Sequence, residues 1–552
     1  MNVVYVTRRS GAAVTALAAL ALYALSLRNG FAYDDVPLIL LDARVHSLRN
    51  LRDILFGPYW PVGGEELAIW RPLTTLSFAV DWALSDGRAA WFHATNTALN
   101  AAACVLVFLL LCEFFTPAAA LVGALLFTVH PVHVEAVANV VGRAEMLAGI
   151  PMLAACLLWA RRPAAEPRPT RLITLATAAL FAVALLAKES AAMLPLLLLL
   201  IDTARGRWRL ERGSVVAYVR AILPALLAFL AVLVAYATAR AAALGGLVPA
   251  RAHPAAAVLE SRAELILTAL QAWPVYLRLL LFPRTLLIDY GPRIIMPATA
   301  WTGPAVAGLV ILTGLVVGGV VAHLRGNGRA ALALLWFPVA ILPVSNLLVT
   351  IGVLVAERTL YVPSFALAVA GAGAAAVLGR LASRAGRGAA LVLGVVGLVL
   401  LGARSAVRVP EWESTERIFA ALARDRPDSS RAHWVLARAA RQAGDRDAAR
   451  EHFARAVQLW PYRDLLVVEA AAFALEEGRL AEGRELAAFG VERWPRNLAL
   501  QRLLAAASLD LGDTAAAWAS IEAGLRLDPA DPMLNQMRAA LTAAGPGEGG
   551  ER

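Results

Sequence analysis

The sequence predicts an all-α protein in which a polytopic membrane body is followed by a soluble helical region. Of its 552 residues, 59% are hydrophobic and the mean hydropathy is +0.64, too apolar for one soluble domain. Apolar runs long enough to approach a membrane span recur up to residue 407. After Pro410 the chain becomes charged and acquires a regular internal period. We therefore expect a membrane body over residues 1–409 and a repeat region over residues 410–552.

About eleven apolar runs predict transmembrane helices, although several are shorter than the roughly 20 residues of a full span. The runs are 11–30, 93–113, 117–133, 144–160, 171–187, 190–202, 216–239, 301–323, 330–346, 361–379 and 388–407. A signal peptide is the alternative for the first run, and its length and the lack of a small-residue cleavage site argue against it.

Basic residues test the alternation of these runs across the membrane. Arginine clusters begin at Arg161, Arg205, Arg325 and Arg380, and all fall on the side of the N-terminus, which begins with Arg8 and Arg9. Positive charge is retained on the cytoplasmic side, so this side is expected to be cytoplasmic. An odd number of spans then places residues 410–552 outside. The preference for Arg over Lys, with abundant Ala and Gly, indicates a bacterial protein, and we expect a multi-pass protein of the inner membrane with a periplasmic C-terminal region.

Composition also bears on partners. The net charge of +10 comes largely from arginines in short loops between apolar runs, which report topology and not a nucleic-acid partner. Cys104, Cys112 and Cys156 all lie within apolar runs and lack metal-ligand spacing, so neither a disulfide framework nor a zinc knuckle is expected.

The region after Pro410 has an internal period of 34 residues. Pro427, Pro461, Pro495 and Pro529 follow this step, and glycines 444, 478 and 512 keep it as well. A 34-residue period with Gly between two helices and Pro after the second is the signature of tetratricopeptide repeats. Such repeats stack into a superhelix whose concave face binds peptides or protein surfaces.

Polar residues gather at the expected outer ends of the spans. Asp34 and Asp35 follow the first span, where adjacent acids beside hydrocarbon usually mark function. They begin the first of two long outer loops, 31–92 and 240–300, the second of which contains Ala263–Phe282, a candidate amphipathic helix in the membrane interface. The other residues at outer ends are His130, His133, Glu135, Asn139, Arg143, Glu145, Lys188, Glu189, Asp289, Tyr290, Glu357, Arg358 and Tyr361.

If residues 132–145 form a helix, Glu135, Asn139 and Arg143 lie on one polar stripe. The stripe could face an active-site cavity, or it could be the wet face of an interfacial helix. His130 and His133 with a nearby acid could also ligate a divalent metal, but the spacing matches no common zinc motif, and we expect no required metal.

Arg358 and Lys188, the only lysine, are cations at the outer face, against the general bias. The bland explanation is that they snorkel to the interface beside Glu357 and Glu189. The functional explanation, which we favour, is that they bind a lipid phosphate, because a guanidinium offers a fork to phosphate oxygens and a nearby cation stabilises a departing phosphate. Arg143, Glu357 and Tyr361 are expected to belong to the same donor-binding group.

An ordered set of motifs joins these observations. The set comprises Tyr33-Asp-Asp35, Trp70-Arg-Pro-Leu-Thr74, Phe92-His93-x-x-Asn96, His130-Pro-Val-His133, Gly142-Arg-Ala-Glu145, Ala187-Lys-Glu189, Leu342-Pro-x-Ser-Asn346 and Ala356-Glu-Arg-x-Leu-Tyr361. It resembles the transmembrane and tetratricopeptide-repeat O-mannosyltransferases of the GT-C superfamily, over nearly the whole chain. The resemblance implies a GT-C fold, an acid of the first outer loop as catalytic base, and a polyprenyl-phosphate sugar as donor. We favour Asp35 slightly over Asp34 as this base, although the sequence does not separate the two. Arg71 and His93 join the expected cavity through these motifs. The segment Leu286–Tyr290 matches the family pattern only loosely.

The residues suit this chemistry in their own right. Transfer from a lipid phosphate needs a base for the acceptor hydroxyl and cations for the departing phosphate, and one carboxylate of an adjacent pair can be the base. We expect an inverting glycosyltransferase that moves mannose or a related hexose to a periplasmic protein held by the repeats. The alternatives are a glycan or lipid acceptor with the same fold, and a non-catalytic membrane anchor for the repeats.

Overall fold

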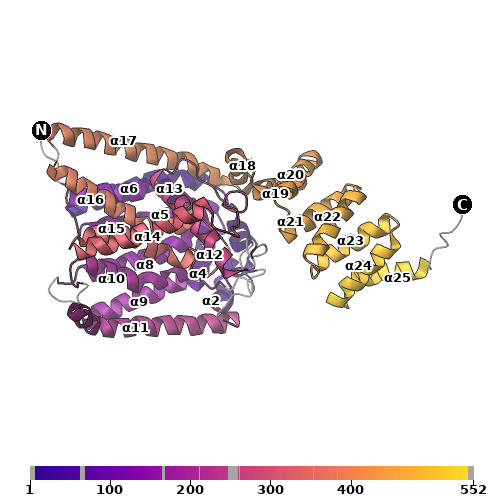
Figure 1. Cartoon of the computed structure of the whole chain (residues 1–552), viewed down its shortest axis with the longest axis horizontal. Helices are drawn as coiled ribbons and strands as arrows, with labels where there is room; N and C mark the ends of the chain where they lie inside the picture. Colours follow the sequence, from indigo (N-terminus) through magenta and orange to yellow (C-terminus); the bar gives the residue numbers. More distant parts are fainter. Residues whose placement is uncertain are drawn as a thin grey trace. The chain divides into compact units, whose positions relative to one another are not determined.

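The computed structural model describes residues 6–61, 69–163, 168–209, 212–246, 259, 261–351, 353–381 and 383–544, and the regular elements among them are all helical (Figure 1). The chain divides into two compact units. One comprises Met1–Tyr290 and Ile295–Ile418, and the other Gly291–Ile294 and Phe419–Arg552. The all-α expectation is confirmed for the described residues, whereas the boundary at residue 409 stays a prediction.

Most of the first unit consists of long apolar helices. They are α1 (Arg8–Tyr23), α5 (Ala89–Leu111), α6 (Pro117–Val129), α8 (Arg143–Ala160), α9 (Arg171–Ala187), α10 (Leu194–Ala204), α11 (Arg212–Leu244), α14 (Gly303–Leu324), α15 (Gly328–Ile341), α16 (Phe365–Leu381) and α17 (Arg384–Arg408). Each of the eleven predicted runs coincides with one of these helices. Shorter elements between them include α2 (Leu51–Phe56) and α4 (Pro72–Ser85) in the first long loop.

The helices and the apolar runs give different numbers of membrane spans. By length and composition, 7 described helices could cross a membrane, or up to 8 if one bent pair counts as a span. Helices α9, α15 and α16 are apolar but shorter. The protein is thus a multi-pass membrane protein, and the count of eleven stays a prediction. The candidate interfacial helix consists of two helices, α12 (Arg262–Leu270) and α13 (Ala272–Leu281). Together they are also long and apolar enough to cross a membrane.

The outermost helices have the surface expected of a lipid-facing element. Helices α11 and α17 lie at opposite edges of the first unit in Figure 1. In the most apolar segment of α11, only 17% of the residues are buried inside the protein. The corresponding value for α17 is 6%. Exposed side chains such as Leu230, Leu391 and Leu393 would be unfavourable in water but suit hydrocarbon.

Helices inside the unit approach closely through small residues. Helix α6 packs against α16, and a Cβ at Gly123 would collide with the carbonyl oxygen of Ala368. Small residues permit such backbone approach, which is the main source of attraction between helices when the solvent is lipid.

The helix is interrupted after α6, and the chain changes direction there. His130 is extended, as expected for a residue before proline, and Pro131 starts the short helix η5 (Pro131–His133), followed by α7 (Val134–Ala138). The break bends the pair by 50°. A second break follows at Asn139, with η6 (Val140–Gly142) leading into α8.

The predicted polar stripe is therefore wrong. Asn139 has φ −81° and ψ 120°, which ends α7, so Glu135, Asn139 and Arg143 do not lie on one helix face. The reason lies in a side chain distant in sequence: the amide of Asn96 donates to the carbonyls of Val137, Asn139 and Val140, which satisfies the free end of α7. Glu135, Asn139 and Arg143 are completely or almost completely buried. Their burial also excludes the alternative that they form the wet face of an interfacial helix.

The second unit contains helices of 13 or 14 residues at the predicted period. They are α19 (Ser430–Gln442), α20 (Arg446–Leu459), α21 (Asp464–Glu476), α22 (Leu480–Arg493), α23 (Leu498–Asp510), α24 (Thr514–Leu527) and α25 (Pro532–Ala544). Gly444, Gly478 and Gly512 end alternate helices with φ of 80°, 73° and 76°, a conformation that favours glycine. Consecutive helices pack against one another. Assignment of the unit to a tetratricopeptide superhelix stays a prediction.

Candidate active site

The two acids of the first outer loop have different environments. Asp35 has no exposed surface, and its carboxylate accepts hydrogen bonds from the backbone N–H groups of Ala32, Val140 and Val141 at 3.1, 3.3 and 2.8 Å. Burial raises the pKa of Asp35 to about 7, although these three bonds oppose the rise. The side chain therefore ties the start of the loop to η6 and is sealed from solvent.

Asp34 is partly exposed and faces a cation. Its Oδ2 lies 3.9 Å from Nη2 of Arg358, and 14% of its side chain is accessible. Arg358 also forms an ion pair with Glu135, and its backbone N–H donates to Oε2 of that acid at 2.9 Å. Three segments far apart in the chain thus meet in what we call the acid–arginine cluster, defined by Asp34, Glu135 and Arg358.

Glu357 lies next to this cluster and is almost completely buried. Its Oε1 accepts from the backbone N–H of Leu287 at 2.5 Å and from the hydroxyl of Tyr290 at 2.7 Å. Burial raises the pKa of Glu357 to about 7, with Arg408 opposing the rise. The loosely matched segment Leu286–Tyr290 is therefore held by Glu357, and the expected role of Glu357 in donor binding stays a prediction.

Arg408 was missed by the sequence analysis. It is buried at the end of α17, where its Nη1 pairs with Glu411 at 2.5 Å and its charge faces Glu357. The sequence pattern could have pointed to this residue, because Arg408 follows the last predicted run on the expected outer face. Lys188 and Arg358 lie at the ends of other runs on the same face.

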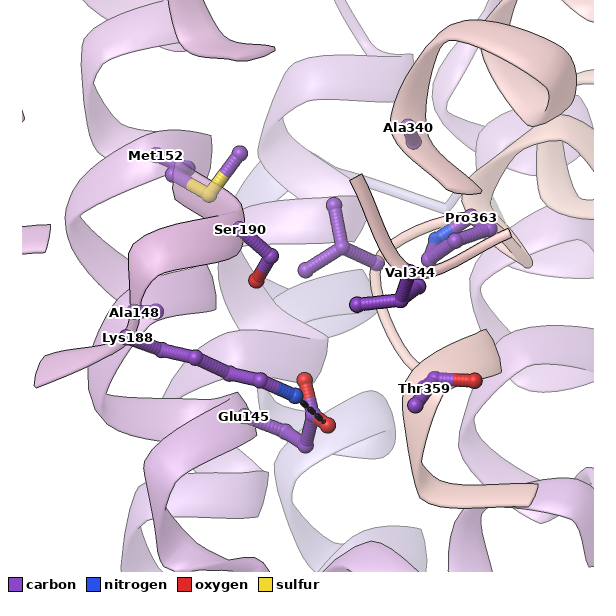
Figure 2. Close-up of a pocket in the computed structure, with 10 residues that line it drawn as sticks. Glu145, Ala148, Met152, Lys188, Ser190, Ala340, Val344, Thr359 and Pro363 are labelled. Atoms are coloured by element: carbon purple, nitrogen blue, oxygen red, sulfur yellow. Dashed lines mark hydrogen bonds and ion pairs between the residues drawn. The ribbon is translucent and has the colours of Figure 1, made fainter. Parts of the chain in front are cut away.

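Lys188 forms a buried ion pair with Glu145 beside a small cavity (Figure 2). The cavity, about 10 Å³, has room for roughly one water molecule. Ser190, Thr359 and Ala340 are among its lining residues. Thr359 follows the arginine of the acid–arginine cluster in sequence, so the cavity borders that cluster.

Arg71 and Glu189 form a second ion pair close by. The guanidinium donates to both carboxylate oxygens, at 2.9 and 2.5 Å, and lies 5.1 Å over the ring of Tyr59. The charges of Asp34 and Arg358 also interact electrostatically with the hydroxyl of Tyr59. The two ion pairs and the acid–arginine cluster therefore lie near one another and make up one charged region, and Tyr59, which the sequence did not single out, is close to both.

Arg143 is turned away from this region. Its guanidinium pairs with Asp81 at 2.5 Å and donates to Asn96, to the carbonyl of Phe92 and to Ser77. Because each of its three guanidinium nitrogens contacts one of these partners, the geometry favours a role in fixing α4 and α5 against α8 over a role in phosphate binding. Asp81, the acid that pairs with Arg143, lies within α4 and away from any predicted span end, so no sequence pattern pointed to it.

The histidines of the predicted cavity are buried in packing contacts. His130 is hydrogen-bonded through Nε2 to the carbonyl of Leu280 at 3.0 Å, and His133 through Nε2 to the hydroxyl of Ser364 at 2.7 Å. No group of three or more His, Cys, Asp or Glu among the described residues is arranged to hold a metal ion. The histidines thus anchor the broken segment after α6 to two later segments.

The remaining predicted residues are buried as well. His93 is hydrogen-bonded to the carbonyl of Gly30 at 3.0 Å, and the hydroxyl of Tyr361 donates to Asn100 at 2.7 Å. The amide atoms of Asn139 have no partner within the described part of the chain. These residues surround the charged region without facing the small cavity.

Comparison with known proteins gives distant relatives. Protein O-mannosyl-transferase TMTC3 of Mus musculus is 28% identical over 376 residues, covering 62% of this chain and 40% of the relative. Protein O-mannosyl-transferase F38B6.6 of Caenorhabditis elegans is 26% identical over 455 residues, 80% of this chain and 61% of the relative. For protein O-mannosyl-transferase TMTC4 of Mus musculus the values are 27%, 496 residues, 80% and 65%.

The chain spans between 40% and 65% of the length of these three curated relatives. No protein-family model matches it. The alignments nevertheless establish the relationship that the motifs suggested: the chain is a distant homologue of the TMTC protein O-mannosyl-transferases.

Proposed function

We propose that this protein is an integral-membrane glycosyltransferase that moves mannose or a related hexose from a polyprenyl phosphate to a hydroxyl of a protein acceptor. The observation that carries the proposal is the acid–arginine cluster, in which Asp34, Glu135 and Arg358 meet from three distant segments. The homology to protein O-mannosyl-transferases supports the reaction class. The arginine distribution supports a location in a bacterial inner membrane with the cluster on the periplasmic side.

Asp34 is the group in this cluster best suited to be the catalytic base. A base must come within hydrogen-bond reach of the acceptor hydroxyl. Asp34 retains accessible surface, whereas Asp35 has none, and both of its carboxylate oxygens accept hydrogen bonds from backbone N–H groups. Asp35 is then a positioning residue that fixes the loop from which its neighbour projects.

The reaction requires one bond to form as another breaks. The acceptor oxygen attacks the anomeric carbon, the bond from that carbon to the phosphate oxygen breaks, and the electron pair leaves with the polyprenyl phosphate. Asp34 takes the hydroxyl proton, and attack opposite the leaving group inverts the anomeric centre. Two carboxylates and one guanidinium leave the cluster with net negative charge, which favours an oxocarbenium-like transition state.

Cations near the cluster would serve the departing phosphate. The 3.9 Å between Arg358 and Asp34 is longer than a hydrogen bond, so that side of the guanidinium can turn to a phosphate oxygen while the pair with Glu135 holds it in place. Lys188 is buried and neutralised by Glu145, so it contributes at longer range or after that pair opens. No metal is required by this scheme.

The second unit would bind the acceptor. Its helices follow the 34-residue period of repeats that present a concave surface to peptides. Such a surface contributes affinity and positioning, and no residue of the proposed chemistry lies in it.

Reconstitution of the full chain tests this function. The purified protein in liposomes is given polyprenyl-phosphate mannose and a peptide rich in Ser and Thr, and the peptide is analysed by mass spectrometry. We expect a hexose on Ser or Thr, with loss of transfer in Asp34→Asn and retention in Asp53→Asn, an exposed acid of the same loop outside the cluster. Transfer to a glycan or lipid but never to the peptide would refute the protein acceptor, and no transfer from any polyprenyl-phosphate sugar would refute the donor class.

A further inference from the structure

A second cavity lies where α10 ends and where α14 passes into α15. It has a volume of about 390 Å³, within the range of small-ligand sites. Three of its lining residues are arginines, Arg205, Arg325 and Arg329, and among the described residues no carboxylate lines it. This cavity, which we call the basic cavity, has no part in the proposed transfer reaction.

The basic cavity is far from the charged region around Lys188. Helix α15 contributes Arg329 at its start to the basic cavity and Ala340 near its end to the small cavity of Figure 2. A helix of 14 residues is about 20 Å long. The two cavities therefore lie at opposite ends of α15, and under the expected topology the basic cavity faces the cytoplasm.

Two tight turns bring the arginines together. Gly206 ends α10 with φ 67°, and Gly326 ends α14 with φ 73°. A Cβ at Gly328 would collide with the carbonyl oxygen of Thr203, so only a glycine lets the two turns touch there. The basic cavity is thus preformed by the backbone and does not depend on flexible side chains alone.

The arginines of the basic cavity have few direct anionic partners, although the charges of Glu113 and Asp202 act on Arg205 from nearby. Arg205 donates from Nη1 to the carbonyl of Glu113 at 2.7 Å, while its buried Nε has no partner. Arg329 lies 5.6 Å from the ring centre of Phe115. Within the described residues, none of the three arginines forms an ion pair with an acid. Retention of positive charge on the cytoplasmic face explains the sign of these residues, but it does not explain why three arginines line one cavity.

We propose that the basic cavity binds a phosphate group, carried by a lipid headgroup or free in solution. Guanidinium groups offer forked donors to phosphate oxygens, and the free N–H groups at the start of α15 add a partial positive charge. The exposed side chain of Leu324, which precedes Arg325 at the end of α14, offers apolar surface next to the basic cavity for the acyl chains of a lipid.

Native mass spectrometry of the full chain in neutral detergent tests this site. The probes are phosphatidic acid, phosphatidylcholine and inorganic phosphate. The test variant replaces Arg205, Arg325 and Arg329 with Gln. The control replaces Arg171, Arg380 and Arg387 with Gln, which removes the same charge from exposed positions outside the basic cavity. Size-exclusion profiles establish that both variants are folded.

We expect the test variant to bind phosphatidic acid at least about tenfold more weakly, because each guanidinium–phosphate contact is a charged hydrogen bond. The control should bind it as the wild type does, and phosphatidylcholine should bind weakly to all three. Displacement of phosphatidic acid by inorganic phosphate identifies the phosphate alone as sufficient, and failure of displacement identifies a lipid. Equal retention of phosphatidic acid by the test and control variants overturns the proposal. If the triple variant is misfolded, Arg329→Gln replaces it, and an unchanged affinity in that variant overturns the proposal as well.

Discussion

Replacement of each acid of the adjacent pair by its amide separates catalysis from positioning. Asp34→Asn removes the base while keeping the shape of the side chain. Loss of a general base lowers rates by about 10²–10⁴-fold, or roughly 3–5 kcal/mol of transition-state stabilisation. The carboxylate of Asp34 is partly exposed and lies 3.9 Å from Arg358, so its removal should leave the folded state almost as stable as before.

Asp35→Asn should behave differently. An amide oxygen can keep the bonds from Ala32 and Val140, but the amide nitrogen then faces the N–H of Val141. An unsatisfied buried donor costs about 1–3 kcal/mol. Against this, the variant no longer buries a charge. The pKa of Asp35, raised by burial from 3.8 to about 7, corresponds to roughly 4 kcal/mol of disfavoured ionisation at neutral pH. We therefore expect a small net change in stability and a loss of rate of about tenfold or less, through displacement of the loop.

The assay measures initial rates of peptide glycosylation and thermal unfolding midpoints for the wild type and both variants in the same detergent. A loss of at least about 100-fold in Asp34→Asn with an unchanged midpoint supports the assignment. The reverse pattern, in which Asp34→Asn is active and Asp35→Asn is inactive but folded, would make the buried acid the base. Wild-type rates in both variants would remove the acid–arginine cluster from the reaction.

Three other outcomes follow from the structure. Because burial raises the pKa of Asp35, its stabilising contribution is complete below about pH 4 and is lost as the pH rises through about 7. The unfolding midpoint of Asp35→Asn relative to that of the wild type should therefore increase between about pH 5 and pH 8. A difference in midpoint that does not change with pH would contradict this. Gly123→Val should separate α6 from α16 at the carbonyl of Ala368 and lower the unfolding free energy by roughly 1–3 kcal/mol, whereas Gly402→Ala, where a Cβ meets only ordinary contacts, should be neutral in the same thermal scans. Arg358→Lys should lower kcat by about tenfold or more because a point charge cannot pair with two acids at once, and an unchanged kcat with a raised KM for the donor would instead show simple ground-state binding.

Much of the fold followed from sequence periodicity. Apolar runs of about the right length located eleven helices of the first unit, and the 34-residue spacing of Gly444, Gly478 and Gly512 located the turns of the second. These patterns are local, because a span needs only length and apolarity and a repeat needs only its neighbours. The break at Asn139 was missed because it depends on a distant side chain, the amide of Asn96, which replaces the next turn of helix.

The candidate site was predicted as a set of residues but not as a set of contacts. Placement at the outer ends of spans put Asp34, Glu135 and Arg358 within a larger predicted set, and the structure brings these three together, while their roles in the reaction stay predictions. It could not reveal that Asp35 is enclosed by backbone N–H groups or that Arg143 is consumed by partners within the fold, since both facts depend on long-range packing. Spacing along the chain reports which residues share a membrane face, and packing decides which of them remain accessible.

Mass spectrometry of periplasmic glycopeptides tests the central claim most directly. Cells that lack the protein are complemented with the wild type or with Asp34→Asn, expressed to equal levels in the membrane. The account predicts that Ser- and Thr-linked hexose on a defined set of peptides is present with the wild type and absent both without the protein and with the variant. The same glycopeptides in cells that lack the protein, or undiminished glycopeptides in cells carrying Asp34→Asn, would contradict it.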